Sequence, residues 1–162
     1  MRIYLVQHGH AVPKEVDPDR PLSDTGRRDI ERLAQFLNAA KVRASRIIHS
    51  GKTRARQTAE ILAKDSGRNV SIDVMSGLNP DDPPMKFAKQ VEEIGEEAVI
   101  ISHLPFLGLL VSRLVADDED QPVVSFKPGS AVCMEKDEAV RWSITLVVRP
   151  EHLSRAVYTD IL

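Results

Sequence analysis

Three short apolar segments of this sequence, each predicted to be a buried β-strand, end in or are followed at once by a histidine. The segments are residues 2–7, 46–49 and 98–102, and the histidines are His8, His49 and His103. Open α/β sheets form their sites at the edge where the carboxyl ends of parallel strands meet. The pattern therefore predicts that these side chains gather at one edge of a sheet.

Stretches with helical spacing of apolar residues separate the predicted strands. The clearest places Ile30, Leu33 and Leu37 on one face, in a helix that opens at Ser23 or Thr25. Further helices are expected from residue 53 to a cap signal at residue 67, over 85–94 and over 105–115. The last of these is apolar nearly all round, so we expect it to be buried.

Additional strands are expected at residues 70–74, 123–126, 131–136 and 141–148. Alternation of strands and helices is typical of a mainly parallel sheet with both faces covered. The sequence therefore predicts an α/β fold, a three-layer α/β/α sandwich with a mainly parallel central sheet. Its length of 162 residues suits a single domain over residues 1–162.

Composition narrows the classes of partner. The formal net charge of −2 argues against a nucleic-acid binder, because no net basic surface is supplied. The longest apolar stretch, residues 104–115, is far short of the ~20 residues of a membrane span. Cys133 is the single cysteine, which excludes an intrachain disulfide and suits a reducing compartment. We expect a cytoplasmic protein that binds neither nucleic acid nor membranes.

Arginines near the predicted strand ends indicate an anion site. Arg54 lies in the first turn of the helix that follows Ser50, where free N–H groups and the helix dipole attract anions. Arg20 lies in the loop before the first helix and is a second candidate. A guanidinium offers parallel donors to phosphate oxygens. Gly9 allows a ligand to approach the backbone closely. Phosphate is therefore the expected anion.

Four segments resemble the histidine phosphatase superfamily. LVQHGHA, at residues 5–11, is similar to the L-x-R-H-G-E/D signature, and RPLSDTG, at 20–26, to R-P-L-T-x-x-G. SGKTRARQTAEIL, at 50–62, resembles S-P-x-x-R-A-x-Q-T, and VIISHLPFLG, at 99–108, resembles the ISHLP-x-x-G segment of the SixA-type branch. The segments occur in the family's order. The chain therefore resembles SixA-type phosphohistidine phosphatases.

This resemblance implies a phosphoglycerate mutase-like fold and roles for individual residues. It implies that His8 attacks phosphorus and forms a transient phosphohistidine, and that His103 and Arg54 complete the catalytic set. It implies that Gln7, Gly9, Arg20, Arg54 and His103 bind the substrate phosphate. No metal or other cofactor is implied. The implied partners are a phosphohistidine-containing protein, such as a phosphotransfer domain, and phosphate-like anions.

The chain departs from the family pattern next to the nucleophile. Gln7 replaces the family arginine, which removes one positive charge from the phosphate site, and His10 stands where a carboxylate or amide is usual. Asp81 and Asp82 are the candidates for an acid that protonates a leaving group, in a loop with three prolines. Because the sequence offers no clear general acid, the expected leaving group is one that needs little protonation, such as the nitrogen of a phosphoramidate.

Three other functions are compatible with these residues. A metal hydrolase would use His8 and His10 as an H-x-H pair, completed by His49 and His103. A non-catalytic phosphate or phosphoprotein reader would follow if Gln7 disables the site. A small-molecule phosphomonoesterase would use the same fold.

Overall fold

The computed structural model describes residues 1–154. Its helices and strands are, in chain order, β1 (Arg2–Gln7), α1 (Asp24–Ala39), β2 (Arg46–His49), α2 (Thr53–Asp65), β3 (Ser71–Val74), α3 (Pro84–Ile94), β4 (Ala98–Ser102), α4 (Phe106–Ala116), β5 (Ala131–Lys136), β6 (Trp142–Val148) and the short 3-10 helix η1 (Pro150–Leu153).

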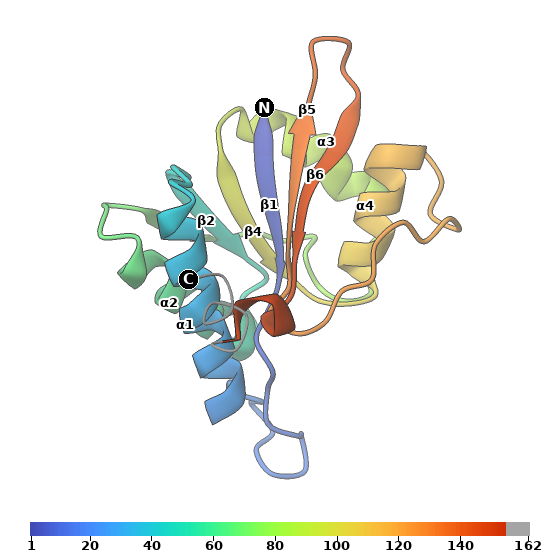
Figure 1. Ribbon diagram of the computed structural model, residues 1–162. Coiled ribbons are helices and arrows are strands. Elements are labelled where there is room, and N and C mark those ends of the chain that lie inside the picture. Colours follow the sequence, from blue (N-terminus) through green and yellow to red (C-terminus); the bar gives the residue numbers. More distant parts are fainter. Residues whose placement is uncertain (155–162) are drawn as a thin grey trace.

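The strands form one sheet in the order β3-β2-β4-β1-β5-β6. The first four run parallel, whereas β5 pairs antiparallel with both β1 and β6 (Figure 1). At the centre, Gln7 of β1 pairs with Ser102 of β4. The residues that follow, His8 and His103, therefore leave the sheet side by side. The predicted mainly parallel sheet is confirmed.

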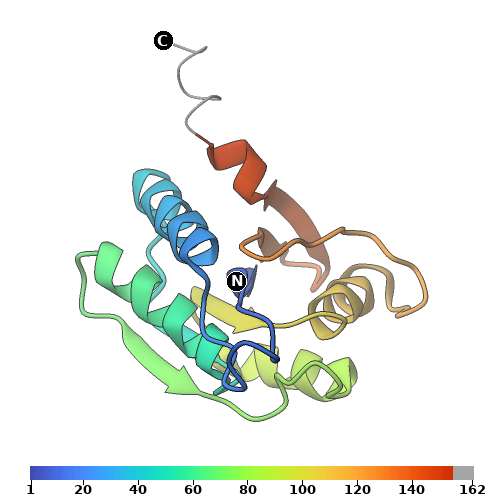
Figure 2. The ribbon, with the colours of Figure 1, turned by 90° about the horizontal axis from the view of Figure 1, so that it is seen from below.

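Helices cover both faces of the sheet and make three layers. Figure 2 shows α1 and α2 on one side and α3 and α4 on the other. Tyr4 and Val6 of β1 pack in the cluster with α1 and α2, whereas Ile3 and Leu5 pack in the cluster with α3 and α4. This alternation follows from the two-residue period of a strand. The predicted α/β/α sandwich is confirmed.

Helix α1 begins where the sequence indicates. Ser23 is its N-cap, and its Oγ accepts a hydrogen bond from the Gly26 N–H at 3.0 Å. Such a cap contributes about 1 kcal/mol. Ile30, Leu33 and Leu37 are buried along the predicted stripe. The capped end of α1 holds the loop that returns from His8 close to the carboxyl edge of the sheet.

Residues 123–126 do not form the expected strand. They cross from α4 to β5, and only Phe126 of this segment is buried. The Ser125 carbonyl accepts a hydrogen bond from the Arg149 guanidinium at 2.8 Å instead of joining a strand ladder. Prolines at 122 and 128 bound the segment and remove two N–H donors. The expectation of a strand there was wrong.

Helix α4 is less buried than its composition indicates. Leu107 and Leu110 have no exposed surface, but Val115 is 39% exposed, so one side of the last turn faces outward.

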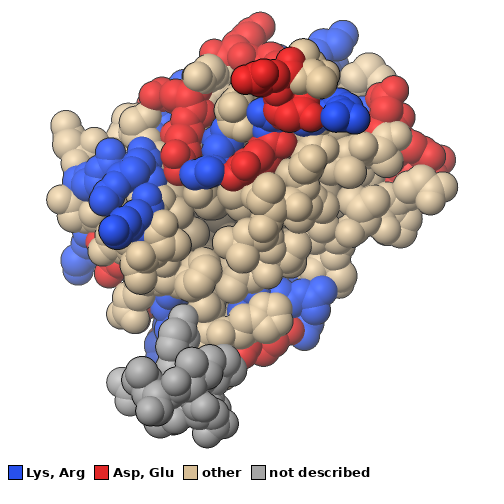
Figure 3. Space-filling model, turned by 45° about the horizontal axis from the view of Figure 1, so that its top comes forward, with Lys and Arg blue, Asp and Glu red and all other residues tan. Residues whose placement is uncertain are grey.

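None of the helices within residues 1–154 is long and apolar enough to cross a membrane. At the end of the molecule where β1 begins, acidic and basic side chains are interspersed (Figure 3). Residues 155–162 of the predicted single domain lie outside the described part of the chain.

Candidate functional site

His8 lies at the carboxyl end of β1 with only 8% of its surface exposed. Its backbone N–H donates to the Ser102 carbonyl at 3.2 Å. Its ring Nδ1 lies 2.7 Å from the Gly9 carbonyl oxygen, and a carbonyl can only accept, so Nδ1 carries the proton. The other nitrogen, Nε2, accepts a hydrogen bond from Arg54 Nε at 3.2 Å. Both contacts require the tautomer whose Nε2 lone pair is available to react.

His103 stands next to His8. Their ring centroids are 4.9 Å apart and the rings are inclined by 50°. His103 is 1% exposed, and its Nε2 lies 2.6 Å from Ser50 Oγ. Its Nδ1 is buried and has no hydrogen-bond partner among residues 1–154. The expected pair of pocket histidines is therefore brought together, with Ser50 as an additional contact.

Both histidines are held neutral near pH 7. Burial lowers the pKa of His8 to about 4, against the opposing effect of the Gly9 hydrogen bond and with help from Arg54. Burial also lowers the pKa of His103 to about 3, and the His8 and Arg54 charges lower it further. Neutral imidazole is the nucleophilic form. The site therefore places an uncharged ring beside the Arg54 guanidinium, a group that can bind an anion.

Helix α2 fixes Arg54 relative to His8. Thr58 Oγ1 donates to the Arg54 carbonyl at 2.8 Å and accepts from the Gly9 N–H at 3.1 Å. A Cβ added at Gly9 would lie 2.8 Å from Ile30 Cγ1 and 2.9 Å from the Gly26 carbonyl oxygen. Gly9 is therefore required by close packing against α1. This packing is a reason for glycine beyond the expected approach of a ligand.

Arg20 and Gln7 are the remaining predicted phosphate contacts. Arg20 has φ 49° and its Nε donates to the Val12 carbonyl at 3.3 Å. It is near enough for its charge to lower the pKa of Arg54, but it makes no hydrogen bond to either pocket histidine. Gln7 is 6% exposed, and its Oε1 is buried without a partner among residues 1–154.

Neither candidate acid, Asp81 or Asp82, is hydrogen-bonded to the pocket histidines or to Arg54 among residues 1–154. Asp82 accepts a hydrogen bond from the Asn79 N–H at 2.7 Å and so closes its own turn, and Asp81 is exposed. The turn does lie beside the carboxyl edge, because Ser102 Oγ donates to the Leu78 carbonyl at 2.6 Å. Within residues 1–154, however, no hydrogen bond joins either aspartate to His8, His103 or Arg54.

The four histidines considered for a metal hydrolase are not brought together. His49 Nδ1 accepts from the Gly51 N–H at 3.0 Å, and the pKa of His49 is lowered by burial and by the charge of Arg56 on α2, with Glu60 opposing. His10 is exposed and contacts Ser23 Oγ at 2.7 Å. In the part of the chain that the structure describes, no three His, Cys, Asp or Glu side chains could hold a metal ion.

Ser50 and Thr58 are site residues that the sequence reasoning missed. The signal for both was their position inside the segment that resembles the family helix.

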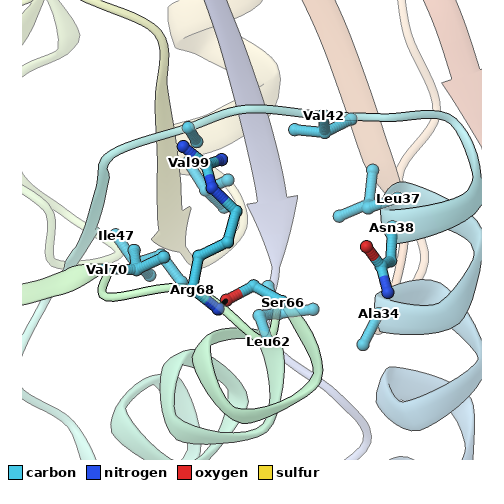
Figure 4. Close-up of a pocket in the computed structure, with 11 residues that line it drawn as sticks. Ala34, Leu37, Asn38, Val42, Ile47, Leu62, Ser66, Arg68, Val70 and Val99 are labelled. Carbon is cyan, nitrogen blue, oxygen red and sulfur yellow. Dashed lines mark hydrogen bonds between the residues drawn. The ribbon is translucent and has the colours of Figure 1, made fainter.

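A separate cavity of about 40 Å³ lies at the opposite end of the sheet (Figure 4). Its lining includes Leu37, Ile47, Arg68 and Val99, and none of the site residues.

Comparisons with known proteins identify relatives. The family model for the histidine phosphatase superfamily (branch 1) matches residues 3–79. The phosphohistidine phosphatase SixA of Escherichia coli (strain K12) is 29% identical over 84% of this chain and 87% of its own. An uncharacterized protein of Picosynechococcus sp. is 34% identical over 67% of this chain and 69% of its own. A structure of the protein histidine phosphatase SixA complexed with tungstate has a TM-score of 0.85 at 24% identity, and the match covers 95% of this chain and 100% of that one.

Proposed function

Because the chain belongs to the histidine phosphatase superfamily and is a phosphatase, we propose that His8 is its nucleophile and that phosphohistidine on a protein is its substrate. One observation carries the proposal: His8 Nδ1 donates to the Gly9 carbonyl, and its unprotonated Nε2 accepts a hydrogen bond from Arg54 Nε. Nucleophile and anion-binding group are thus already in contact.

The first half of the proposed reaction is attack on phosphorus. Arg54 transfers its hydrogen bond from His8 Nε2 to a phosphoryl oxygen, and Nε2 forms a bond to phosphorus as the bond to the leaving nitrogen breaks. The leaving imidazole departs neutral when its other ring nitrogen already carries a proton, and otherwise takes up a proton from water. Fixed donors such as Arg54 and His103 stabilise the charge spread over the phosphoryl oxygens.

The second half is hydrolysis of the intermediate. Water attacks phosphorus, the bond from phosphorus to His8 Nε2 breaks, and inorganic phosphate leaves with the protons of the water divided between phosphate and solvent. His8 returns to the tautomer that the Gly9 carbonyl requires. The two steps use the same in-line geometry from opposite sides of the phosphorus, so one pocket serves both.

Two observations support the proposed substrate class: no carboxylate bonds to the pocket histidines among residues 1–154, and the E. coli relative is a phosphohistidine phosphatase. Among residues 1–154, no carboxylate is hydrogen-bonded to His8 or His103. A phosphoramidate, whose leaving nitrogen is readily protonated, depends less on a general acid than an alkyl phosphate does. The E. coli relative is a phosphohistidine phosphatase. A phosphotransfer domain in the cytoplasm is therefore the substrate that we propose.

A trapping experiment tests the proposal. The protein is mixed with a ³²P-labelled phosphohistidine domain, quenched in base, and the label is mapped by mass spectrometry. We expect label on His8, release of phosphate, and neither in His8→Ala, whose fold is checked by circular dichroism. His152→Ala is the matched control, since that histidine is exposed and lies in η1. Label on another residue, or normal turnover in His8→Ala, contradicts the nucleophile assignment. Faster turnover of an aryl phosphate than of the domain indicates a small-molecule phosphomonoesterase.

A further inference from the structure

The two ring nitrogens of His103 differ in their surroundings. Nε2 lies 2.6 Å from Ser50 Oγ, whereas Nδ1 is buried with no partner among residues 1–154. Because the pKa of His103 is lowered to about 3, the ring is neutral near pH 7 and only one nitrogen carries a proton. Buried polar atoms without partners are rare and costly. The position of that single proton therefore decides what Nδ1 can bind.

The Ser50 hydroxyl has one proton to donate. Its oxygen already accepts from the Lys52 backbone N–H, at a long 3.5 Å. The only acceptor that the described residues offer to its proton is His103 Nε2. If Nε2 carried the ring proton instead, the hydroxyl proton would have no acceptor there, and the Nδ1 lone pair would meet the ligand. A lone pair repels phosphoryl oxygens, while an N–H binds them.

The turn that carries Ser50 is held independently of His103. Gly51 has φ 89°, a left-handed conformation that glycine adopts without strain, and its N–H donates to His49 Nδ1 at 3.0 Å. His49 lies at the end of β2 and pairs with Ile101 of β4, two residues before His103. The hydroxyl is thus presented to the ring from a neighbouring strand, so its geometry is set by the sheet.

We propose that Ser50 is a positioning residue that acts through His103: its hydroxyl donates to Nε2, which places the ring proton on Nδ1 as a donor to a phosphoryl oxygen. The inference rests on the proposed function, because it needs a phosphoryl group on the His8 side of the ring. In this arrangement, His103 donates a hydrogen bond to the transferring phosphoryl group without placing an additional charge beside the proposed nucleophile.

The expected effects follow from this division of roles. Ser50→Ala leaves the His103 ring in place but frees its tautomer, so part of the population presents a lone pair. Removing a preorganised donor outright costs about 10²–10³ in rate, and a freed tautomer costs less, about tenfold to a hundredfold in kcat/KM. Vanadate affinity falls in parallel. Ser50→Thr keeps the hydroxyl and restores most of both.

Nitrogen-15 NMR of the histidine rings tests the tautomer directly. In the wild type we expect the His103 Nδ1 shift of a protonated nitrogen and the Nε2 shift of an unprotonated one. The pattern persists in Ser50→Thr and becomes mixed in Ser50→Ala. Ser112→Ala is the matched control, because Ser112 is a buried serine on α4 and is expected to change neither spectrum nor rate.

Two results overturn the inference: a wild-type ring protonated on Nε2, or a Ser50→Ala protein with unchanged tautomer and unchanged vanadate affinity. The wild-type spectrum alone decides the first even if Ser50→Ala fails to fold. Failure of the proposed function is distinguishable, since it would appear as no turnover of phosphohistidine with the tautomer and vanadate effects intact.

Discussion

Replacing Gly26 by alanine tests how the site is built against helix α1. A Cβ added at Gly26 would lie 2.0 Å from the His10 carbonyl oxygen and 2.7 Å from the His10 nitrogen. These are backbone atoms, two residues after His8, and cannot turn aside as a flexible side chain can. Gly26→Ala must therefore push the loop after His8 away from α1.

The expected change in the free energy of unfolding can be compared with that at a second glycine inside a helix. Alanine gains about 1 kcal/mol over glycine inside a helix, and overpacking costs about 1–3 kcal/mol or more when the neighbour cannot yield. Gly108 lies inside α4, and its added Cβ meets nothing within 4 Å. We expect Gly26→Ala to lower the free energy of unfolding by about 1–2 kcal/mol and Gly108→Ala to raise it by about 0.5–1 kcal/mol.

Thermal and urea unfolding measure this pair, and activity on an aryl phosphate measures the consequence for the site. At about 2–4 °C per kcal/mol for a chain of this size, the two variants move the Tm in opposite directions. Gly26→Ala should also lose activity at temperatures where it is fully folded, because Gly9 and His8 move with His10. Equal Tm shifts of the same sign, or full activity in a destabilised Gly26→Ala, would refute the reasoning.

Three further predictions concern charge. Arg54→Ala should weaken vanadate binding about 100-fold, the effect of losing one preorganised donor. Inhibition constants measure this change, and Arg56→Ala is the control, because Arg56 is an exposed neighbour paired with Glu60. Equal vanadate affinity in Arg54→Ala and the wild type would contradict the proposed phosphate clamp. Gln7→Arg should maintain or raise activity on an aryl phosphate by adding charge to the site, and a large loss in steady-state rate would show that the site depends on the amide. The pKa of His8 is lowered to about 4, so kcat/KM should stay level down to about pH 5 and fall as the pH drops through the folded pKa. Between the ordinary histidine pKa of about 6.5 and the lowered pKa of folded His8, the unfolded chain binds more protons than the folded one. The free energy of unfolding, measured in urea titrations, should therefore fall as the pH is lowered through this window. The decrease should be smaller in His8→Asn.

Much of the site is encoded by local pattern. Strands that end in histidine, the stripe of α1 and its Ser23 cap are each set within a few residues, and a parallel sheet brings strand ends to one edge whatever the loops do. The resemblance of the family-like segments adds the proposed roles of His8 and Arg54. The pairing of His8 with His103 also needed the strand order, because only the folded sheet places β1 next to β4.

Contacts between distant segments were decided by the tertiary structure. The sequence alone did not show that His49 turns toward α2 while His103 turns toward Ser50, that Asp82 closes its own turn, or that Arg20 bonds to the Val12 carbonyl. Nor did it show that residues 123–126 bind Arg149 in place of a strand. Each depends on which of several competing partners lies within about 3 Å, the reach of a hydrogen bond, and that distance is fixed only when the helices pack on the sheet.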